Sequence, residues 1–157
     1  GYDSTILEAV RAANEKQKLL PIGFLKKSLK TLKGKRIAVW GLSFKPRTDD
    51  VREAPALLII ETLLKSGASV VAFDPVATEN AKTVLKSNAR LKFAKDQYAA
   101  TDGADALVVA TEWDEFRTAD FADLQKRMRG TVIVDGRNIF ERNEVESAGF
   151  TYYGVGV

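Results

Sequence analysis

A short apolar run, Ile37-Ala38-Val39-Trp40, ends at Gly41 and has the pattern of a buried β-strand. Downstream, similar apolar runs alternate with amphipathic segments. We expect strands over residues 69–73, 91–93, 104–110, 131–134 and 150–153, and helices over residues 56–65, 79–87, 96–102, 121–128 and 140–148. Continuous apolar strands that alternate with helices are typical of a parallel sheet covered on both faces. The pattern predicts an α/β fold: a Rossmann-like, doubly wound, mainly parallel sheet.

The first part of the chain differs from the rest. Residues 2–32 are predicted to form two helices or one kinked helix, with Pro21 and Gly23 at the break. Ile6, Val10 and Ala13 form an apolar stripe at helical spacing. We therefore divide the chain into an N-terminal helical segment, residues 1–33, and a Rossmann-like domain, residues 34–157.

Composition excludes several classes of function. The 157 residues include 24 basic and 21 acidic ones, a net charge of +3 that is too small to indicate a nucleic-acid partner. Cysteine and histidine are absent, which removes a thiol nucleophile and the commonest metal ligands, so we expect no metal site. The sequence has neither a membrane-spanning run nor a signal peptide, so we expect no membrane partner and a cytoplasmic protein. Since it begins with Gly1 in place of a methionine, we expect a fragment or a processed chain.

The loop after the first strand, residues 41–55, is the first candidate ligand site. In open α/β sheets, ligands bind at the carboxyl ends of the strands. This loop lacks the G-x-G-x-x-G pattern of dinucleotide sites, but it offers Lys45, Arg47 and Arg52 to phosphate oxygens. From spacing alone, a phosphate site and a solvated loop are equally good interpretations. Asp49 and Asp50 fit better as caps of the following helix.

Three later positions also fall at expected strand ends. Asp74 stands where a ribose-binding acid would be, although Asp-Pro after a strand is more often only a turn. Arg137 could reach a cleft or simply be exposed. Trp113 and Phe116 could pack over a base, but a role in the core or in a lid is favoured.

The loop Gly41-Leu42-Ser43-Phe44-Lys45-Pro46-Arg47-Thr48-Asp49-Asp50-Val51-Arg52-Glu53-Ala54-Pro55 resembles the signature of the UDP-glucose/GDP-mannose dehydrogenase family. The segments 73–75, 111–116 and 135–138 resemble later family segments in the same order, and residues 7–17 resemble the end of the family's central helix. The resemblance implies the C-terminal UDP-binding domain of such an enzyme. By resemblance, Phe44, Lys45 and Arg137 would contact the UDP-sugar, and Arg52 would reach NAD held by another domain.

The resemblance further implies oxidation of UDP-glucose to UDP-glucuronate with two NAD, by a homodimer whose catalytic cysteine lies outside this chain. We expect no catalytic residue here, and binding without turnover. Three alternatives remain open: the same domain of a UDP-N-acetylmannosamine dehydrogenase, that of a GDP-mannose dehydrogenase, and a stand-alone nucleotide-binding module.

Overall fold

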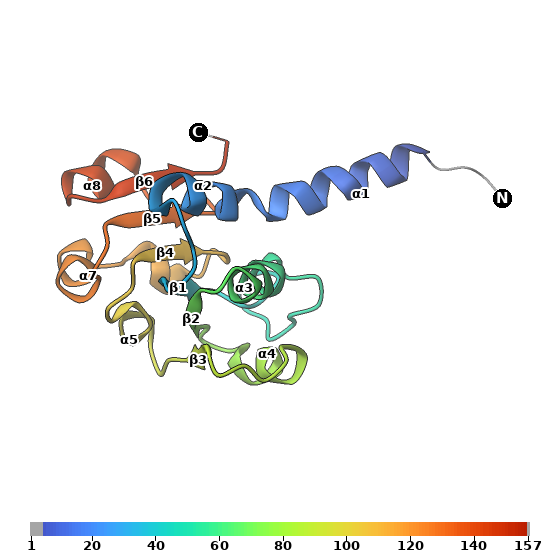
Figure 1. Cartoon of the computed structure of the whole chain (residues 1–157), viewed down its shortest axis with the longest axis horizontal. Coiled ribbons are helices and arrows are strands. Elements are labelled where there is room, and N and C mark those ends of the chain that lie inside the picture. The colour runs from blue at the N-terminus through green and yellow to red at the C-terminus, as the bar shows by residue number, and fades with distance from the viewer. Residues whose placement is uncertain (1–4, 157) are drawn as a thin grey trace.

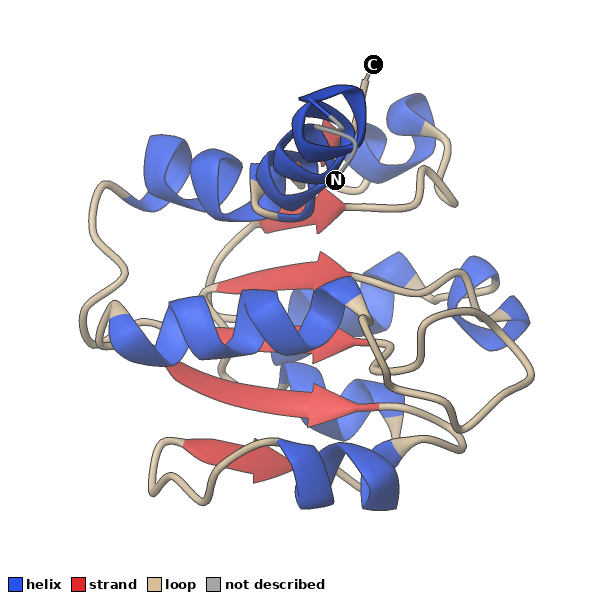
Figure 2. Ribbon diagram, turned by 90° about the vertical axis from the view of Figure 1, so that its right-hand side faces the viewer, coloured by secondary structure: helices blue, strands red, loops and turns tan. Residues whose placement is uncertain are grey.

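The computed structural model describes residues 5–156 and contains one six-stranded sheet (Figures 1 and 2). Its strands are β1 (Arg36–Trp40), β2 (Ser69–Phe73), β3 (Leu91–Phe93), β4 (Ala106–Val109), β5 (Val132–Asp135) and β6 (Thr151–Gly154). Every neighbouring pair is parallel, in the order β3-β2-β1-β4-β5-β6. This confirms the predicted doubly wound fold. The strand order reverses between β1 and β4, so a ligand crevice is expected at their carboxyl ends.

Helices cover both faces of the sheet (Figure 2). One face packs against α2 (Leu20–Leu29), α3 (Pro55–Lys65) and α4 (Thr78–Val84). The other packs against α5 (Gln97–Thr101), α6 (Asp114–Arg117), α7 (Phe121–Arg127) and α8 (Arg142–Ser147). All four residues of β4 are buried, as the continuous apolar run of a central parallel strand requires.

Several helices begin where the sequence offers a cap or a proline. Asp96 accepts a hydrogen bond from Ala99 N at the start of α5, and Asp120 caps α7 in the same way. Pro55 begins α3, where its missing N–H leaves no helical bond unmade. The prediction that Asp49 and Asp50 cap the helix is wrong, because the N-cap of α3 is Ala54 and no side chain caps this helix.

The N-terminal segment forms two helices, α1 (Thr5–Lys18) and α2, and the predicted break is displaced. The break falls at Leu19, because Pro21 is tolerated in the first turn of α2. α2 also ends at Leu29, where Lys30 adopts a φ of 63°, and does not continue to residue 32. α1 projects beyond the sheet (Figure 1), and Leu7 and Val10 on it are exposed. The side chain of Ile6 lies outside the described residues.

Candidate functional site

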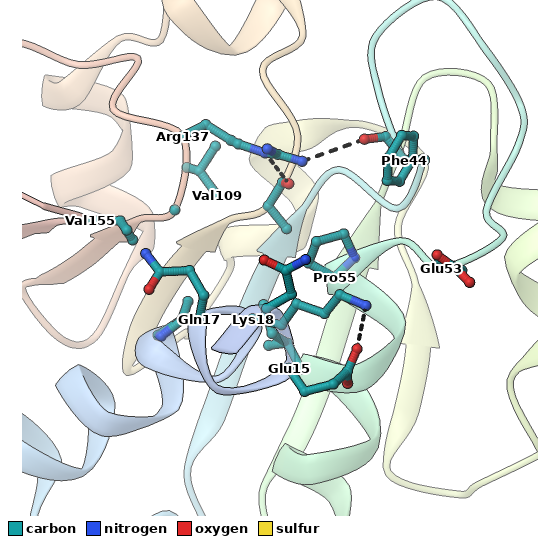
Figure 3. Close-up of a pocket in the computed structure, with 14 residues that line it drawn as sticks. Glu15, Gln17, Lys18, Phe44, Glu53, Pro55, Val109, Arg137 and Val155 are labelled. Atoms are coloured by element: carbon teal, nitrogen blue, oxygen red, sulfur yellow. Dashed lines mark hydrogen bonds and ion pairs between the residues drawn. The ribbon is translucent and has the colours of Figure 1, made fainter. Parts of the chain in front are cut away.

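A cleft of about 830 Å³ opens at the carboxyl ends of β1, β4 and β5. The residues that line it come from seven parts of the chain: the end of α1, the start of α2, the loop between β1 and α3, the start of α3, the end of β4, the end of β5, and the segment after β6. Figure 3 shows Arg137 and Phe44 on one side, with Lys18 and Glu15 of α1 facing them. The cleft therefore lies at the point where the strand order reverses, and its volume falls within the range of small-molecule sites.

Arg137 lies at the rim of the cleft, and contacts of its backbone and of its guanidinium fix its position. Its N–H donates to the buried Asp135 carboxylate at the end of β5, at 3.0 Å. Gly136 before it leaves no room for a side chain, since an added Cβ would lie 2.8 Å from Val109 O. The guanidinium then extends over the end of β4, where Nε donates to Ala110 O at 2.9 Å. Two neighbouring strand ends thus fix the base of this side chain.

The far end of Arg137 reaches the loop after β1. Its Nη2 lies 3.4 Å from Phe44 O, and its Nε lies 3.1 Å from Glu112 Oε2. Glu112 Oε2 is buried and makes no hydrogen bond of good geometry. The cleft therefore contains a guanidinium whose partners are one carboxylate and two carbonyl oxygens, so it retains donor capacity for an incoming anion.

Phe44 joins Arg137 in the cleft, but Lys45 does not. Phe44 is 49% exposed and lines the cleft, and its N–H donates to Asp50 O at 2.8 Å, which closes the loop on itself. Lys45 is exposed and does not line the cleft. Of the three predicted sugar-nucleotide contacts, the structure brings Phe44 and Arg137 together in the cleft and leaves Lys45 exposed outside its lining.

Arg52 lies outside this cleft. It forms an ion pair with Asp50 at 2.7 Å, with 87% of its side chain exposed. Hydrogen bonds from Arg52 lower the pKa of Asp50 to about 2. Both residues line a separate hollow of about 500 Å³ beside α4. An exposed guanidinium on the outer side of the loop could meet a ligand carried by another domain, so its predicted contact with NAD stays a prediction.

Asp74 forms the predicted turn, and its side chain also binds groups in two other loops. It is 2% exposed, and its two oxygens accept six hydrogen bonds from the chain's own groups. Burial alone would raise the pKa of the Asp74 carboxyl, but four backbone N–H donors outweigh it and lower the pKa. The favoured interpretation as a turn residue is correct, and the oxygens are already occupied. The Asp-Pro pair at a strand end was the available signal for this role.

The aromatic residues near the cleft belong to the core, which is one of the two roles favoured for them. Trp113 is buried, and its Nε1 donates to Asp74 Oδ2 at 3.1 Å. Phe116 is fully buried and stacks on Trp40 with ring centroids 5.1 Å apart. Neither ring is offered to a base.

The charges around the cleft suit recognition of a ligand more than catalysis. Lys18 and Arg137 face it, each with a carboxylate close by, and Lys18 Nζ lies 2.7 Å from Glu15. Among residues 5–156, no group of three or more potential ligands could hold a metal ion, and no helix is long and apolar enough to cross a membrane. The arrangement combines an aromatic ring, mixed charge and a helix N-terminus at α3, which together fit a polar, phosphate-containing molecule.

Comparison with known proteins supports this interpretation. Residues 38–142 match the model of the UDP-glucose/GDP-mannose dehydrogenase family, UDP binding domain. A UDP-glucose 6-dehydrogenase of Pseudomonas aeruginosa is 45% identical over 99% of this chain and 35% of its own length. Two solved structures are similar. The UDP-glucose dehydrogenase of Pyrobaculum islandicum has a TM-score of 0.79 and 34% identity, over 94% of this chain and 31% of that one. The UDP-D-ManNAc dehydrogenase of Pyrococcus horikoshii has a TM-score of 0.80 and 29% identity, over 99% and 34%.

Proposed function

The chain belongs to the UDP-glucose/GDP-mannose dehydrogenase family, and we propose that its cleft binds the nucleotide-sugar substrate of a UDP-glucose 6-dehydrogenase. It spans about a third of the length of the relatives it matches, 35% for the Pseudomonas aeruginosa protein. The activity, cofactor and assembly proposed below therefore concern a longer protein.

The juxtaposition of Arg137 and Phe44 in one cleft carries the proposal. A guanidinium with free donors can hold the negatively charged pyrophosphate of UDP, and a half-exposed ring can cover the apolar side of a sugar or base. Lys45, next to Phe44, would add a third contact if the exposed loop closes over the ligand. The N-terminus of α3 lies nearby, since Pro55 lines the cleft, and its helix dipole favours negative charge.

The longer protein is proposed to oxidise UDP-glucose to UDP-glucuronate. Conversion of a primary alcohol to a carboxylate removes four electrons, so it consumes two NAD molecules, each accepting one hydride. Arg52 is proposed to contact NAD from the outer side of the loop, and a homodimer is the proposed assembly. The cytoplasm is the proposed location.

UDP-glucose is favoured over related sugars by sequence similarity. The UDP-glucose 6-dehydrogenase is 45% identical to this chain, whereas the UDP-D-ManNAc dehydrogenase is 29% identical. The chain itself contains no cysteine and no histidine, so the proposed role is binding without turnover.

Titration calorimetry of this chain with UDP, UDP-glucose, GDP and NAD tests the proposal. We expect UDP and UDP-glucose to bind at least about tenfold more tightly than GDP or NAD, a difference of about 1.4 kcal/mol. UDP-glucose mixed with NAD and the chain should give no rise in NADH absorbance. Equal affinity for all four ligands, or tightest binding of NAD, would contradict the proposal.

A further inference from the structure

The buried carboxylate of Asp74 connects two loops that border the cleft. Its Oδ2 accepts hydrogen bonds from Leu42 N at 2.7 Å, from Ser43 N at 3.0 Å and from Ser43 Oγ at 3.1 Å. The same oxygen accepts from Trp113 Nε1 at 3.1 Å, in the loop after β4. One oxygen atom at the end of β2 thus fixes the first residues after β1 and the loop after β4 together.

The other oxygen of Asp74 anchors the carboxylate to its own turn. Oδ1 accepts from Val76 N at 2.9 Å and from Ala77 N at 2.7 Å. These two donors determine the direction of the carboxyl group, so that Oδ2 points toward the loop after β1. An aspartate has two acceptor oxygens, and here both are needed.

The residues held by Asp74 lead directly into the cleft. Ser43 is fully buried, and its carbonyl accepts a 2.6 Å hydrogen bond from Thr111 Oγ1, so its backbone is fixed on both sides. The next residue is Phe44, whose ring lines the cleft and whose carbonyl oxygen faces Arg137. Asp74 is therefore connected to the cleft through only two residues, Ser43, which it binds by hydrogen bonds, and Phe44, which follows Ser43.

We propose that Asp74 is a positioning residue for the nucleotide-sugar, and that it acts by fixing Leu42 and Ser43 so that Phe44 is held opposite Arg137. The inference rests on the proposed function of the cleft. Asp74 itself does not touch the ligand, because its oxygens are occupied. Its contribution is to order the loop before the ligand arrives, so that binding does not have to supply that ordering.

Asp105 provides a matched control. It is also a largely buried carboxylate, 6% exposed, and it also accepts a backbone N–H, from Arg36 at 2.8 Å. Arg129 adds two side-chain hydrogen bonds to it. Asp105 lies just before β4 and beside the first residue of β1, at the opposite ends of the strands from the cleft. Its loss should weaken the fold without disturbing Phe44.

The experiment compares the UDP affinity of this chain and of its Asp74→Asn and Asp105→Asn variants by calorimetry, at a temperature where circular dichroism shows each one folded. The amide can accept at one oxygen only, so one set of donors loses its partner. If one backbone residue has to be ordered when UDP binds, the conformational entropy that is lost corresponds to about a 5- to 30-fold weaker affinity. We expect Kd to rise about tenfold in Asp74→Asn and to stay within about twofold in Asp105→Asn.

A double-mutant cycle separates positioning from general destabilisation. If Asp74 acts through the Phe44–Arg137 pair, the effect of Asp74→Asn on UDP binding should shrink to about twofold in an Arg137→Ala background. Unchanged affinity in Asp74→Asn, or equal losses in the two aspartate variants, would overturn the inference while the proposed function stands. Failure of the unmodified chain to bind UDP would instead overturn the proposed function.

A milder variant covers the case in which Asp74→Asn does not fold. Ser43→Ala removes only the hydroxyl that joins Asp74 Oδ2 and Trp113 Nε1, so most of the network remains. We expect a folded protein whose Kd for UDP rises about threefold. The change is smaller than for the carboxylate, because the two hydrogen bonds of the hydroxyl are lost while the backbone N–H donors of Asp74 keep their acceptors. A folded Ser43→Ala protein with the affinity of the unmodified chain would count against the positioning role.

Discussion

Substitution of Arg137 by alanine gives the most direct test of the cleft. The guanidinium donates to Ala110 O at 2.9 Å and approaches Phe44 O at 3.4 Å, so it is already oriented when a phosphate arrives. A hydrogen bond that involves a charged group contributes about 1.5–3 kcal/mol. Loss of one such bond to the pyrophosphate corresponds to about a 10- to 100-fold weaker affinity for UDP.

The same substitution should cost little stability. The Arg137 and Glu112 side chains are 30% and 33% exposed, so the pair is partly solvated even though Glu112 Oε2 itself is buried. Partly exposed pairs of this kind contribute at most about 1 kcal/mol. Calorimetry with UDP measures the first effect, and urea unfolding followed by circular dichroism measures the second.

Arg52→Ala is the matched control, because it removes the same side chain from a site outside the cleft. The Arg52 side chain is 87% exposed and pairs with Asp50. We expect unchanged UDP affinity within about twofold, since such an exposed substitution has little effect on the fold. In the longer protein, Arg52→Ala should weaken the use of NAD. If Arg137→Ala left the affinity for UDP intact, or if both variants lowered it equally, the assignment of Arg137 to the nucleotide-sugar would be refuted.

Two further predictions concern stability. Gly41→Ala should destabilise the chain by more than about 2 kcal/mol in urea unfolding, because φ is 89° and an added Cβ would lie 2.5 Å from Thr111 Cβ. Gly103→Ala, at φ 67° with open space around it, should show only the smaller cost of the backbone angle, and equal costs for both would refute the steric argument. Stability should also fall in acid: folding lowers the pKa of Asp74 and of Asp105 below 3.8, so their contribution is present above that pH and is lost as the pH falls through the folded values. A urea midpoint that stays constant from about pH 5 to pH 2 would contradict this.

The sequence was sufficient to predict the sheet because each strand is specified locally. Residues 69–73 and 91–93 were predicted with the bounds that the structure shows. For residues 69–73 the signal is local, because the apolar run lies between Gly67 and Pro75. The break between the first two helices was predicted at Pro21 and Gly23 but falls at Leu19. Proline interrupts a helix when it lies in the helix interior, and it is tolerated in the first turn. Whether Pro21 lies in the interior or in the first turn depends on how α2 packs on the sheet.

The site was only partly predictable, since it depends on which way side chains point. Phe44 and Lys45 are adjacent in the loop, yet only Phe44 lines the cleft. Arg137 could be placed because the strand before it fixes its position. The network around Asp74 joins segments more than 30 residues apart, so no local pattern could have indicated its partners.

The order of the strands has a consequence for how the molecule folds. The strands on either side of the cleft, β1 and β4, are hydrogen-bonded neighbours, yet the contact between Arg36 and Asp105 at their start joins residues 69 positions apart. Loops of that length close late, because the chain loses conformational entropy before the contacts between the paired strands can form. The pairs within β1–β2–β3 and within β4–β5–β6 are joined by shorter crossovers, so both units can form before β1 pairs with β4. We therefore expect the cleft to form only with this long-range pairing, so that a ligand bound there would stabilise only molecules that have completed it.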